Sequence, residues 1–276
     1  MKIFVETSWL NENLYKSNIK IIDSSWYLPN EKRNCYNDYL KQHIPGSLFI
    51  DIDNISDEKS KLPHMLPNYE KFETFVRICG INNNSTIIVY DTNGIYSSPR
   101  LWWMFKYFGT SKVYILNGGL KKWKKEKRIL SKKIQIPKKG KFKSKILHKY
   151  LSKKNDILKK LENKNYVIID ARSENRFLGM EKEPRKNVRK GKIPNSKNLV
   201  WKKLINEDGT MKSNNKLNKI FNNLQLSKKN RIISTCGSGI TACIINIALA
   251  KMNFSNISVY DGSWAEWGSD KKLPIE

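Results

Sequence analysis

The sequence lacks any hydrophobic run that approaches the roughly 20 residues needed to span a bilayer. It also lacks a secretory signal at its start, because the apolar stretch after Lys2 meets the acidic Glu6 after only three residues. These two absences argue against a membrane-spanning or exported protein. We therefore expect a cytoplasmic protein with no membrane partner.

Cysteine and histidine are scarce, with four cysteines and three histidines among 276 residues. The cysteines, at positions 35, 79, 236 and 243, form no C-x-x-C pair. This spacing argues against a structural zinc site and against a disulfide framework. We expect no metal and no cofactor, and the cysteines are then buried thiols with one reactive thiol among them.

Acidic residues are also few, with 25 aspartates and glutamates against 52 lysines and arginines and a net charge of +27. Such a charge invites a nucleic-acid hypothesis. However, the excess is mostly lysine spread over nearly every surface segment, and no recognition-helix or aromatic-interleaved basic motif accompanies it. Lysine, asparagine and isoleucine are all abundant and all have A/T-rich codons, so genome composition is a sufficient explanation. We expect no specific nucleic-acid partner.

Four landmarks of the first half return in the same order in the second half, at offsets of about 145 residues, so the chain is a tandem duplication. The first set is Ile21-Ile22-Asp23, Ile44-Pro45-Gly46-Ser47, Ile87-Ile88-Val89-Tyr90-Asp91 and Val113-Tyr114-Ile115-Leu116. The second set is Val167-Ile168-Ile169-Asp170, Ile193-Pro194-Asn195-Ser196, Arg231-Ile232-Ile233-Ser234-Thr235-Cys236 and Ile257-Ser258-Val259-Tyr260.

Each half alternates short apolar, β-branched runs with helical patterns, which is typical of a parallel sheet covered by helices on both faces. We therefore predict an α/β fold with two domains of similar architecture. The stretch 126–155 is dense in lysine and predicts a linker. The domains are then 1–125 and 156–276.

The two halves differ at the end of one predicted strand, where Asp91 in the first half stands opposite Cys236 in the second. Ligands of open α/β sheets bind beyond the carboxyl ends of the strands. The loop after Cys236 is small and turn-permissive, so its backbone amides can surround the sulfur, and the helix that follows adds positive potential that stabilises a thiolate. The alternative is a buried cysteine before a glycine turn, which suits Cys243 inside the helix.

Two chemistries use a cysteine in such a loop. Phosphatases carry arginine at the sixth position after the cysteine, and this position is Ala242 here. Phosphate-ester hydrolysis is therefore disfavoured. Sulfur transfer remains, in which the thiolate stores a sulfur atom as a persulfide.

The chain resembles the two-domain rhodanese family, and within it the 3-mercaptopyruvate sulfurtransferases. The resemblance covers nearly the whole chain in family order. One departure is Lys192-Ile193-Pro194-Asn195, where the family has His and Gly flanking Ile-Pro. The matching stretches are Cys236-Gly237-Ser238-Gly239-Ile240-Thr241-Ala242, His43-Ile44-Pro45-Gly46, Asp51-Ile52-Asp53, Pro63-His64-Met65-Leu66-Pro67, Ser98-Pro99-Arg100-Leu101-Trp102-Trp103-Met104-Phe105, Gly118-Gly119-Leu120, Asp170-Ala171-Arg172, Arg176-Phe177 and Tyr260-Asp261-Gly262-Ser263-Trp264-Ala265-Glu266-Trp267.

The resemblance implies two tandem rhodanese-like domains, of which only the second carries the nucleophile. It implies that sulfur moves from 3-mercaptopyruvate, which is released as pyruvate, to the catalytic Cys236. Ser238, His64 and Asp53 match the proton relay proposed for the subfamily. The residues implied to bind substrate are Arg176, Arg185, Gly237, Gly239, Ile240 and Thr241. By itself the sequence predicts a structural ion pair between Arg172 and Asp170 rather than a substrate contact.

Thiosulfate sulfurtransferase activity is the alternative, although thiosulfate-type rhodaneses place basic side chains where Gly237 and Ser238 stand here. A persulfide carrier or binding module for a partner protein is the other alternative. The implied acceptor is a thiol such as thioredoxin or a small thiol, or cyanide.

Overall fold

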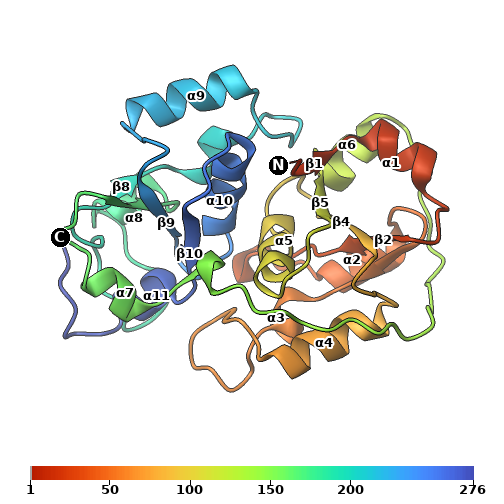
Figure 1. Cartoon of the computed structure of the whole chain (residues 1–276), viewed down its shortest axis with the longest axis horizontal. Coiled ribbons are helices and arrows are strands. Elements are labelled where there is room, and N and C mark those ends of the chain that lie inside the picture. Colours follow the sequence, from red (N-terminus) through yellow and green to blue (C-terminus); the bar gives the residue numbers. More distant parts are fainter. Residues whose placement is uncertain (1) are drawn as a thin grey trace.

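The computed structural model describes residues 2–276, and it shows two halves that lie side by side (Figure 1). Each half contains one sheet of five parallel strands with helices packed around it. Within residues 2–276 no helix combines the length and the apolar character needed to cross a membrane.

The first sheet has the strand order β1-β5-β4-β2-β3. Its central strand, β4, is built from Ile87, Ile88, Val89 and Tyr90, all completely buried. The elements of this half are β1 (Phe4–Val5), α1 (Thr7–Asn13), β2 (Ile19–Asp23), η1 (Pro29–Glu31), α2 (Cys35–Lys41), β3 (Ser47–Phe49), α3 (Ile52–Ile55), α4 (Tyr69–Ile78), β4 (Thr86–Tyr90), α5 (Ser98–Tyr107), β5 (Val113–Leu116) and α6 (Gly119–Lys125).

The second sheet repeats this topology in the order β6-β10-β9-β7-β8. The predicted α/β class and the duplication are therefore confirmed. The elements are η2 (His148–Tyr150), β6 (Leu151–Ser152), α7 (Lys154–Leu158), β7 (Tyr166–Asp170), α8 (Glu174–Phe177), β8 (Lys197–Asn198), η3 (Trp201–Leu204), α9 (Asn214–Asn223), β9 (Arg231–Thr235), α10 (Ala242–Lys251), β10 (Ile257–Tyr260) and α11 (Ser263–Trp267).

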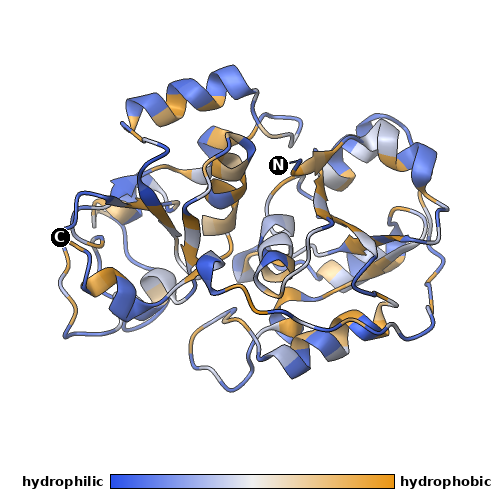
Figure 2. Cartoon of the chain, viewed as in Figure 1, coloured by the Kyte–Doolittle hydropathy of each residue, from blue (hydrophilic) through white to orange (hydrophobic). Residues whose placement is uncertain are grey.

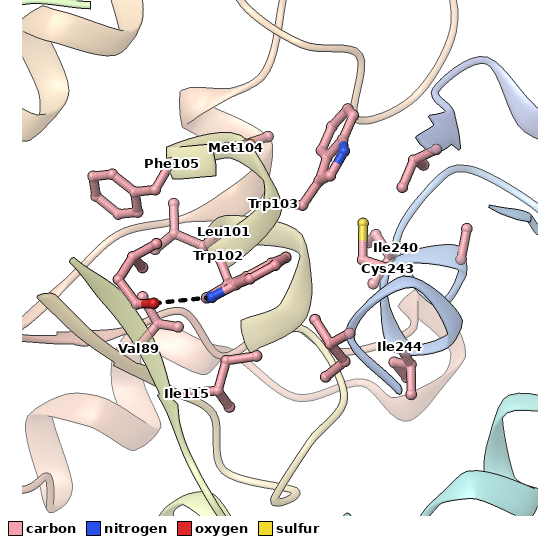
Figure 3. Packing of buried hydrophobic residues seen from close by; sticks show 14 of the residues in the cluster. Val89, Leu101, Trp102, Trp103, Met104, Phe105, Ile115, Ile240, Cys243 and Ile244 are labelled. Carbon is pink, nitrogen blue, oxygen red and sulfur yellow. Dashed lines mark hydrogen bonds between the residues drawn. The ribbon is translucent and has the colours of Figure 1, made fainter. Parts of the chain in front are cut away.

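Two helices, α5 and α10, join the halves. Every residue of α5 is buried, and so is every residue of α10 except Lys251. Helices that are buried on every side pack against several neighbours. The two helices contact each other, and each contacts two strands of its own sheet. Figure 3 shows Trp102 and Trp103 of α5 lying between the first sheet and Ile240, Cys243 and Ile244 of the second half. One hydrophobic cluster thus runs through both halves, whereas outer helices such as α9 are mostly hydrophilic (Figure 2).

The lysine-rich segment predicted as a linker is ordered along its length. Its first part, 126–147, lies against the first half, where Phe142 is buried beside Phe72. Amides of this part donate to carbonyls at the ends of α4 and α5. Residues 148–155 contain η2 and β6, and β6 belongs to the second sheet. The domain limits 1–125 and 156–276 stay a prediction.

A buried carboxylate in the first half lacks the cation that its counterpart has. Asp170, at the end of β7, pairs with Arg172, whose side chain is almost completely buried, so the predicted ion pair is confirmed. The carboxylate of Asp23, at the end of β2, accepts from the amide and hydroxyl of Ser25, and the Tyr90 hydroxyl also hydrogen-bonds to it. Within residues 2–276 it has no ion-pair partner. Burial raises the pKa of Asp23 to about 6, against these hydrogen bonds, and Asp91 adds to the rise.

We expect Asp23→Asn to stabilise the protein near neutral pH. The pKa of Asp23 is higher in the folded state than its usual 3.8, so its ionisation opposes folding. The loss of unfolding free energy caused by ionising Asp23 is absent below about pH 4 and grows between about pH 4 and 6. Above that window it reaches about 3 kcal/mol. Unfolding by urea should show a gain for Asp23→Asn at about pH 7.5 that disappears at about pH 4.

The matched control is Asp170→Asn at the equivalent position of the second half. That change leaves the buried Arg172 without the carboxylate of Asp170, so it should lower the free energy of unfolding at both pH values. A gain for Asp23→Asn that does not change with pH would contradict this account of Asp23.

Candidate active site

Cys236 directly follows β9, at the carboxyl end of the second sheet, and it is 2% exposed. Its amide donates to the Ser263 hydroxyl at 3.2 Å, and its carbonyl accepts from the Trp264 amide at 2.9 Å. The start of the loop is therefore anchored to α11, and the loop then leads into the N-terminus of α10.

The loop holds the sulfur through one amide. Gly239 donates its N–H to Sγ of Cys236 at 3.1 Å, from a backbone with φ of +81° that favours glycine. The sequence predicts several such amides, and this is the one that bonds the sulfur. The amides of Gly237, Ser238, Ile240 and Thr241 have no hydrogen-bond partner within residues 2–276. They remain as donors for negative charge at the start of a ten-residue helix.

The corresponding loop of the first half shows how such a turn binds an anion. Asp91 occupies the place of the cysteine, and its Oδ2 accepts from the amides of Tyr96, Ser97 and Ser98 at 2.9, 3.1 and 2.9 Å. The Ser98 hydroxyl adds a fourth donor at 2.7 Å. The first half therefore fills its own anion site with a carboxylate, while the second half places a thiol there.

Two arginines lie beside the first residue after the cysteine. A Cβ atom added to Gly237 would lie 3.1 Å from Nη2 of Arg176 and 3.8 Å from Nη1 of Arg185. The glycine thus leaves space that the two guanidinium groups use. Arg176 comes from α8, and Arg185 from the irregular segment after it.

The two arginines have different partners. Arg176 pairs with the buried carboxylate of Glu183 at 2.5 Å, and Glu183 also binds Arg172 at 2.8 Å. Arg185 has no hydrogen-bond or ion-pair partner in the described part of the chain. Burial lowers the pKa of Arg185 and the charge of Arg176 adds to this, while Cys236 and Glu183 act in the opposite direction. Arg185 is therefore a half-buried cation that is free to bind a carboxylate.

His64 and Asp53 face Cys236 from the first half. Nε2 of His64 lies 3.1 Å from Oδ1 of Asp53, and Trp26 donates to the other carboxylate oxygen at 2.9 Å. Burial acts to raise the pKa of Asp53, but the hydrogen bonds from His64 and Trp26, with the charge of His64, outweigh it and lower the pKa. The aspartate thus stays ionised and orients the imidazole.

The third member of the expected relay, Ser238, is linked to His64 through its backbone. Nδ1 of His64 lies 3.4 Å from the Ser238 carbonyl oxygen, and the Ser238 hydroxyl has no partner among residues 2–276. Both ring nitrogens of His64 therefore face acceptors. A neutral ring can donate to only one of them, and a ring protonated at both nitrogens would donate to both.

All of these side chains meet at one cavity of about 1360 Å³ between the halves. Nine of the ten predicted site residues line it, and the tenth, Gly239, bonds the sulfur from within the loop. Residues 2–276 contain no group of three or more histidine, cysteine or acidic side chains that could hold a metal ion. The nine are Cys236, Gly237, Ser238, Ile240, Thr241, Arg176, Arg185, His64 and Asp53.

Sequence reasoning missed several residues around the cavity. Trp26 and Tyr96 line its wall, and their rings stack at 6.4 Å. Glu183 orients Arg176, and Arg100 pairs with Asp261 behind the loop at 2.7 Å. Arg100 and Asp261 lie in stretches that match the rhodanese family, and this match was the one sign in the sequence that pointed to them. Nothing in the sequence alone pointed to Glu183.

Comparisons with known proteins agree with this geometry. A model of the rhodanese-like domain matches residues 6–126 and again residues 153–270. The 3-mercaptopyruvate sulfurtransferase of Escherichia coli (strain K12) is 40% identical over 275 residues, which cover 99% of this chain and 97% of that protein. The Arabidopsis thaliana protein named thiosulfate/3-mercaptopyruvate sulfurtransferase 1, mitochondrial, is 37% identical over 293 residues, covering 99% of this chain and 77% of that one.

A solved structure agrees as well. The crystal structure of SseA from Escherichia coli, a 3-mercaptopyruvate sulfotransferase with the "rhodanese" fold, has a TM-score of 0.88 and 37% identity to this chain. The match covers 96% of this chain and 99% of that chain. The expected family and fold are therefore confirmed.

We expect Gly239→Ala to damage the loop more than its backbone conformation alone explains. A methyl group there would lie 2.9 Å from Nη1 of Arg100 and 3.0 Å from the Asp261 carbonyl oxygen. Gly46→Ala is the control, since Gly46 has φ of +78° and nothing within 4 Å of the added atom.

Both variants lose about 1–2 kcal/mol of unfolding free energy to left-handed strain. Only Gly239→Ala should lose more, and only it should slow the alkylation of Cys236 by iodoacetamide. Equal losses with unchanged alkylation would show that the Gly239 contacts do not matter to the sulfur.

Proposed function

This chain belongs to the family of proteins built from rhodanese-like domains, and from that premise we propose that it is a 3-mercaptopyruvate sulfurtransferase acting through a Cys236 persulfide. One observation carries the choice of donor. The loop after Cys236 contains no charged side chain, and two guanidinium groups that line the cavity, those of Arg176 and Arg185, lie set back beside Gly237. This arrangement suits a donor with its sulfur at one end and a carboxylate at the other.

The arginines would bind the carboxylate of 3-mercaptopyruvate, which places the sulfur of the donor at the loop. Arg185 brings an unpaired guanidinium to this contact, while Arg176 is held in place by Glu183. The half-buried position of Arg185 strengthens its hydrogen bonds to an anion, because water competes less.

The first step forms an S–S bond and breaks a C–S bond. The Cys236 thiolate attacks the donor sulfur, and the electron pair of the C–S bond leaves with the carbon fragment as the enolate of pyruvate. The persulfide keeps the transferred sulfur and the proton of the donor thiol, or releases that proton. The free amides of Gly237, Ser238, Ile240 and Thr241 would stabilise a deprotonated persulfide.

The enolate needs one proton to become pyruvate, and His64 would supply it. The ring faces two acceptors, Asp53 and the Ser238 carbonyl, so a ring protonated at both nitrogens would give up the proton on the Ser238 side while Asp53 keeps it oriented. The Ser238 hydroxyl would pass the proton between this ring and the donor.

In the second step an acceptor thiolate attacks the outer sulfur, which regenerates the Cys236 thiolate and releases an acceptor persulfide. The cavity of about 1360 Å³ is large for a small keto acid, which supports entry of the acceptor along the same path. Thioredoxin, a small thiol and cyanide as acceptors, and a cytoplasmic location, stay predictions.

Thiosulfate is the second candidate donor. The double name of the Arabidopsis relative favours it, and a free guanidinium such as that of Arg185 also binds a sulfonate oxygen. Measuring kcat/KM for both donors with one acceptor separates the two. A clear preference for thiosulfate would replace the proposed donor and leave the Cys236 nucleophile in place.

We expect 3-mercaptopyruvate to add about 32 Da to the protein, the mass of one sulfur atom, on Cys236. Mass spectrometry of the intact protein should find this adduct in the wild type and in Cys35→Ser, Cys79→Ser and Cys243→Ser. Cys236→Ser should lack both the adduct and turnover, since it removes the nucleophile. Turnover in Cys236→Ser would refute the proposed mechanism.

We expect Arg185→Met to lower kcat/KM for 3-mercaptopyruvate by about ten- to a hundredfold, the worth of one charge-assisted hydrogen bond of about 1.5–3 kcal/mol. Arg185→Lys should recover only part of this, because an ammonium cannot reproduce the planar fork. Alkylation of Cys236 by the neutral iodoacetamide, which has no carboxylate to bind, should change much less than kcat/KM, since only the charge interaction of Arg185 with Cys236 is lost there.

Lys186→Met removes a neighbouring positive charge that does not line the cavity, and it serves as the control. If Lys186→Met has the same effect as Arg185→Met, the donor responds to the overall charge of this segment and not to a specific contact.

A further inference from the structure

Arg100 crosses the boundary between the halves. It lies in the first turn of α5, its guanidinium is completely buried, and Nη1 lies 2.7 Å from Oδ1 of Asp261 in the second half. The guanidinium carbon also lies 4.5 Å from the centroid of the Trp103 ring. A buried ion pair needs further hydrogen bonds to offset its desolvation. The backbone groups that make these hydrogen bonds identify the segment that the ion pair holds in place.

The pair brackets the segment that carries His64. Nη2 of Arg100 donates to the His64 carbonyl oxygen, and Oδ2 of Asp261 accepts from the Leu66 amide at 2.7 Å. One arm of the bracket thus comes from each half of the chain. His64 has a φ of +60°, a conformation that residues other than glycine rarely adopt, so the segment depends on its surroundings to stay in place.

The same guanidinium also faces the cysteine loop. Nη1 of Arg100 lies 3.5 Å from the Gly239 carbonyl oxygen, and the amide of Gly239 donates to Sγ of Cys236. One side chain therefore contacts the backbone of His64 and the backbone of the residue that bonds the sulfur. Neither Arg100 nor Asp261 lines the cavity, so neither is placed to touch the donor.

We propose that Arg100 and Asp261 are positioning residues, which hold the His64 imidazole at a set place relative to the Cys236 loop. This inference rests on the proposed function, in which His64 moves a proton during sulfur transfer. Without the pair, the nucleophile and the arginines remain, but proton transfer by His64 no longer coincides with cleavage of the C–S bond. The loss should therefore appear in kcat and not in donor binding.

The test is a double-mutant cycle with Arg100→Lys and His64→Asn, measured with 3-mercaptopyruvate. In the wild-type background, Arg100→Lys should lower kcat by about tenfold or more and change KM by less than about threefold. In the His64→Asn background the same change should alter kcat by less than about twofold, because no imidazole remains to be positioned. Equal losses in the two backgrounds would overturn the proposal.

Arg189→Lys is the matched control, since Arg189 also holds main-chain carbonyls, but within the second half alone. Its guanidinium donates to Trp267, Gly268, Asp270 and Leu273. This variant should lower Tm as Arg100→Lys does, while any effect on kcat should be the same with and without His64. A loss that depends on His64 here too would show that general loosening of the fold produces the signal, and would overturn the proposal.

Asp261→Asn is the second variant, because it keeps an acceptor for Leu66 and removes the charge opposite Arg100. It should show the same dependence on His64. If neither Arg100→Lys nor Asp261→Asn yields folded protein, the pair serves the fold alone and the proposal fails. A wild-type protein that forms no persulfide would refute the proposed function itself, whereas normal wild-type turnover with additive losses refutes only the positioning role.

Discussion

The buried ion pair between Arg100 and Asp261 is the interaction on which the geometry of the site depends. The apolar contact between α5 and α10 holds the halves together, but hydrophobic contact has no direction and tolerates small rotations. The ion pair adds direction through its flanking hydrogen bonds, because Nη2 of Arg100 also donates to the His64 carbonyl and Oδ2 of Asp261 accepts from the Leu66 amide. Its two side chains are 0% and 5% exposed, with charged atoms 2.7 Å apart. Leaving either one unpaired would cost about 3–5 kcal/mol. This penalty defines how the edge that carries His64 faces the edge that carries Cys236.

The duplicated loops show how one fold produces a scaffold and a reactive site. In the first half, four donors converge on a carboxylate oxygen of Asp91, so the loop is satisfied by its own side chain. In the second half, Cys236 takes one amide, and four other loop amides have no partner in the described part of the chain. A carboxylate saturates the donors and closes the site. A thiol leaves the loop amides available to bind the negative charge of a deprotonated persulfide.

Glu183 makes the two arginines at the cavity different, because it pairs with Arg176 and not with Arg185. Its buried carboxylate binds Arg172 on one side and Arg176 on the other, which links the core of the second half to the cavity. Arg185 has no such partner among residues 2–276, so its charge is available to a ligand. A site with two equally paired arginines would bind an anion less well, because each guanidinium would first have to leave its own carboxylate.

The sequence by itself determined the α/β class, the duplication and the position of the cysteine loop, because apolar runs, repeated landmarks and a Cys-Gly-Ser-Gly turn are local patterns. It also predicted the ion pair of Arg172 with Asp170, which lie two residues apart. Only the tertiary structure decided which distant groups meet. His64 reaches Ser238 through a backbone carbonyl, Glu183 divides its carboxylate between two arginines, and Arg100 pairs across the boundary with Asp261. These contacts depend on how two sheets pack, and no spacing along the chain encodes a distance across a cavity.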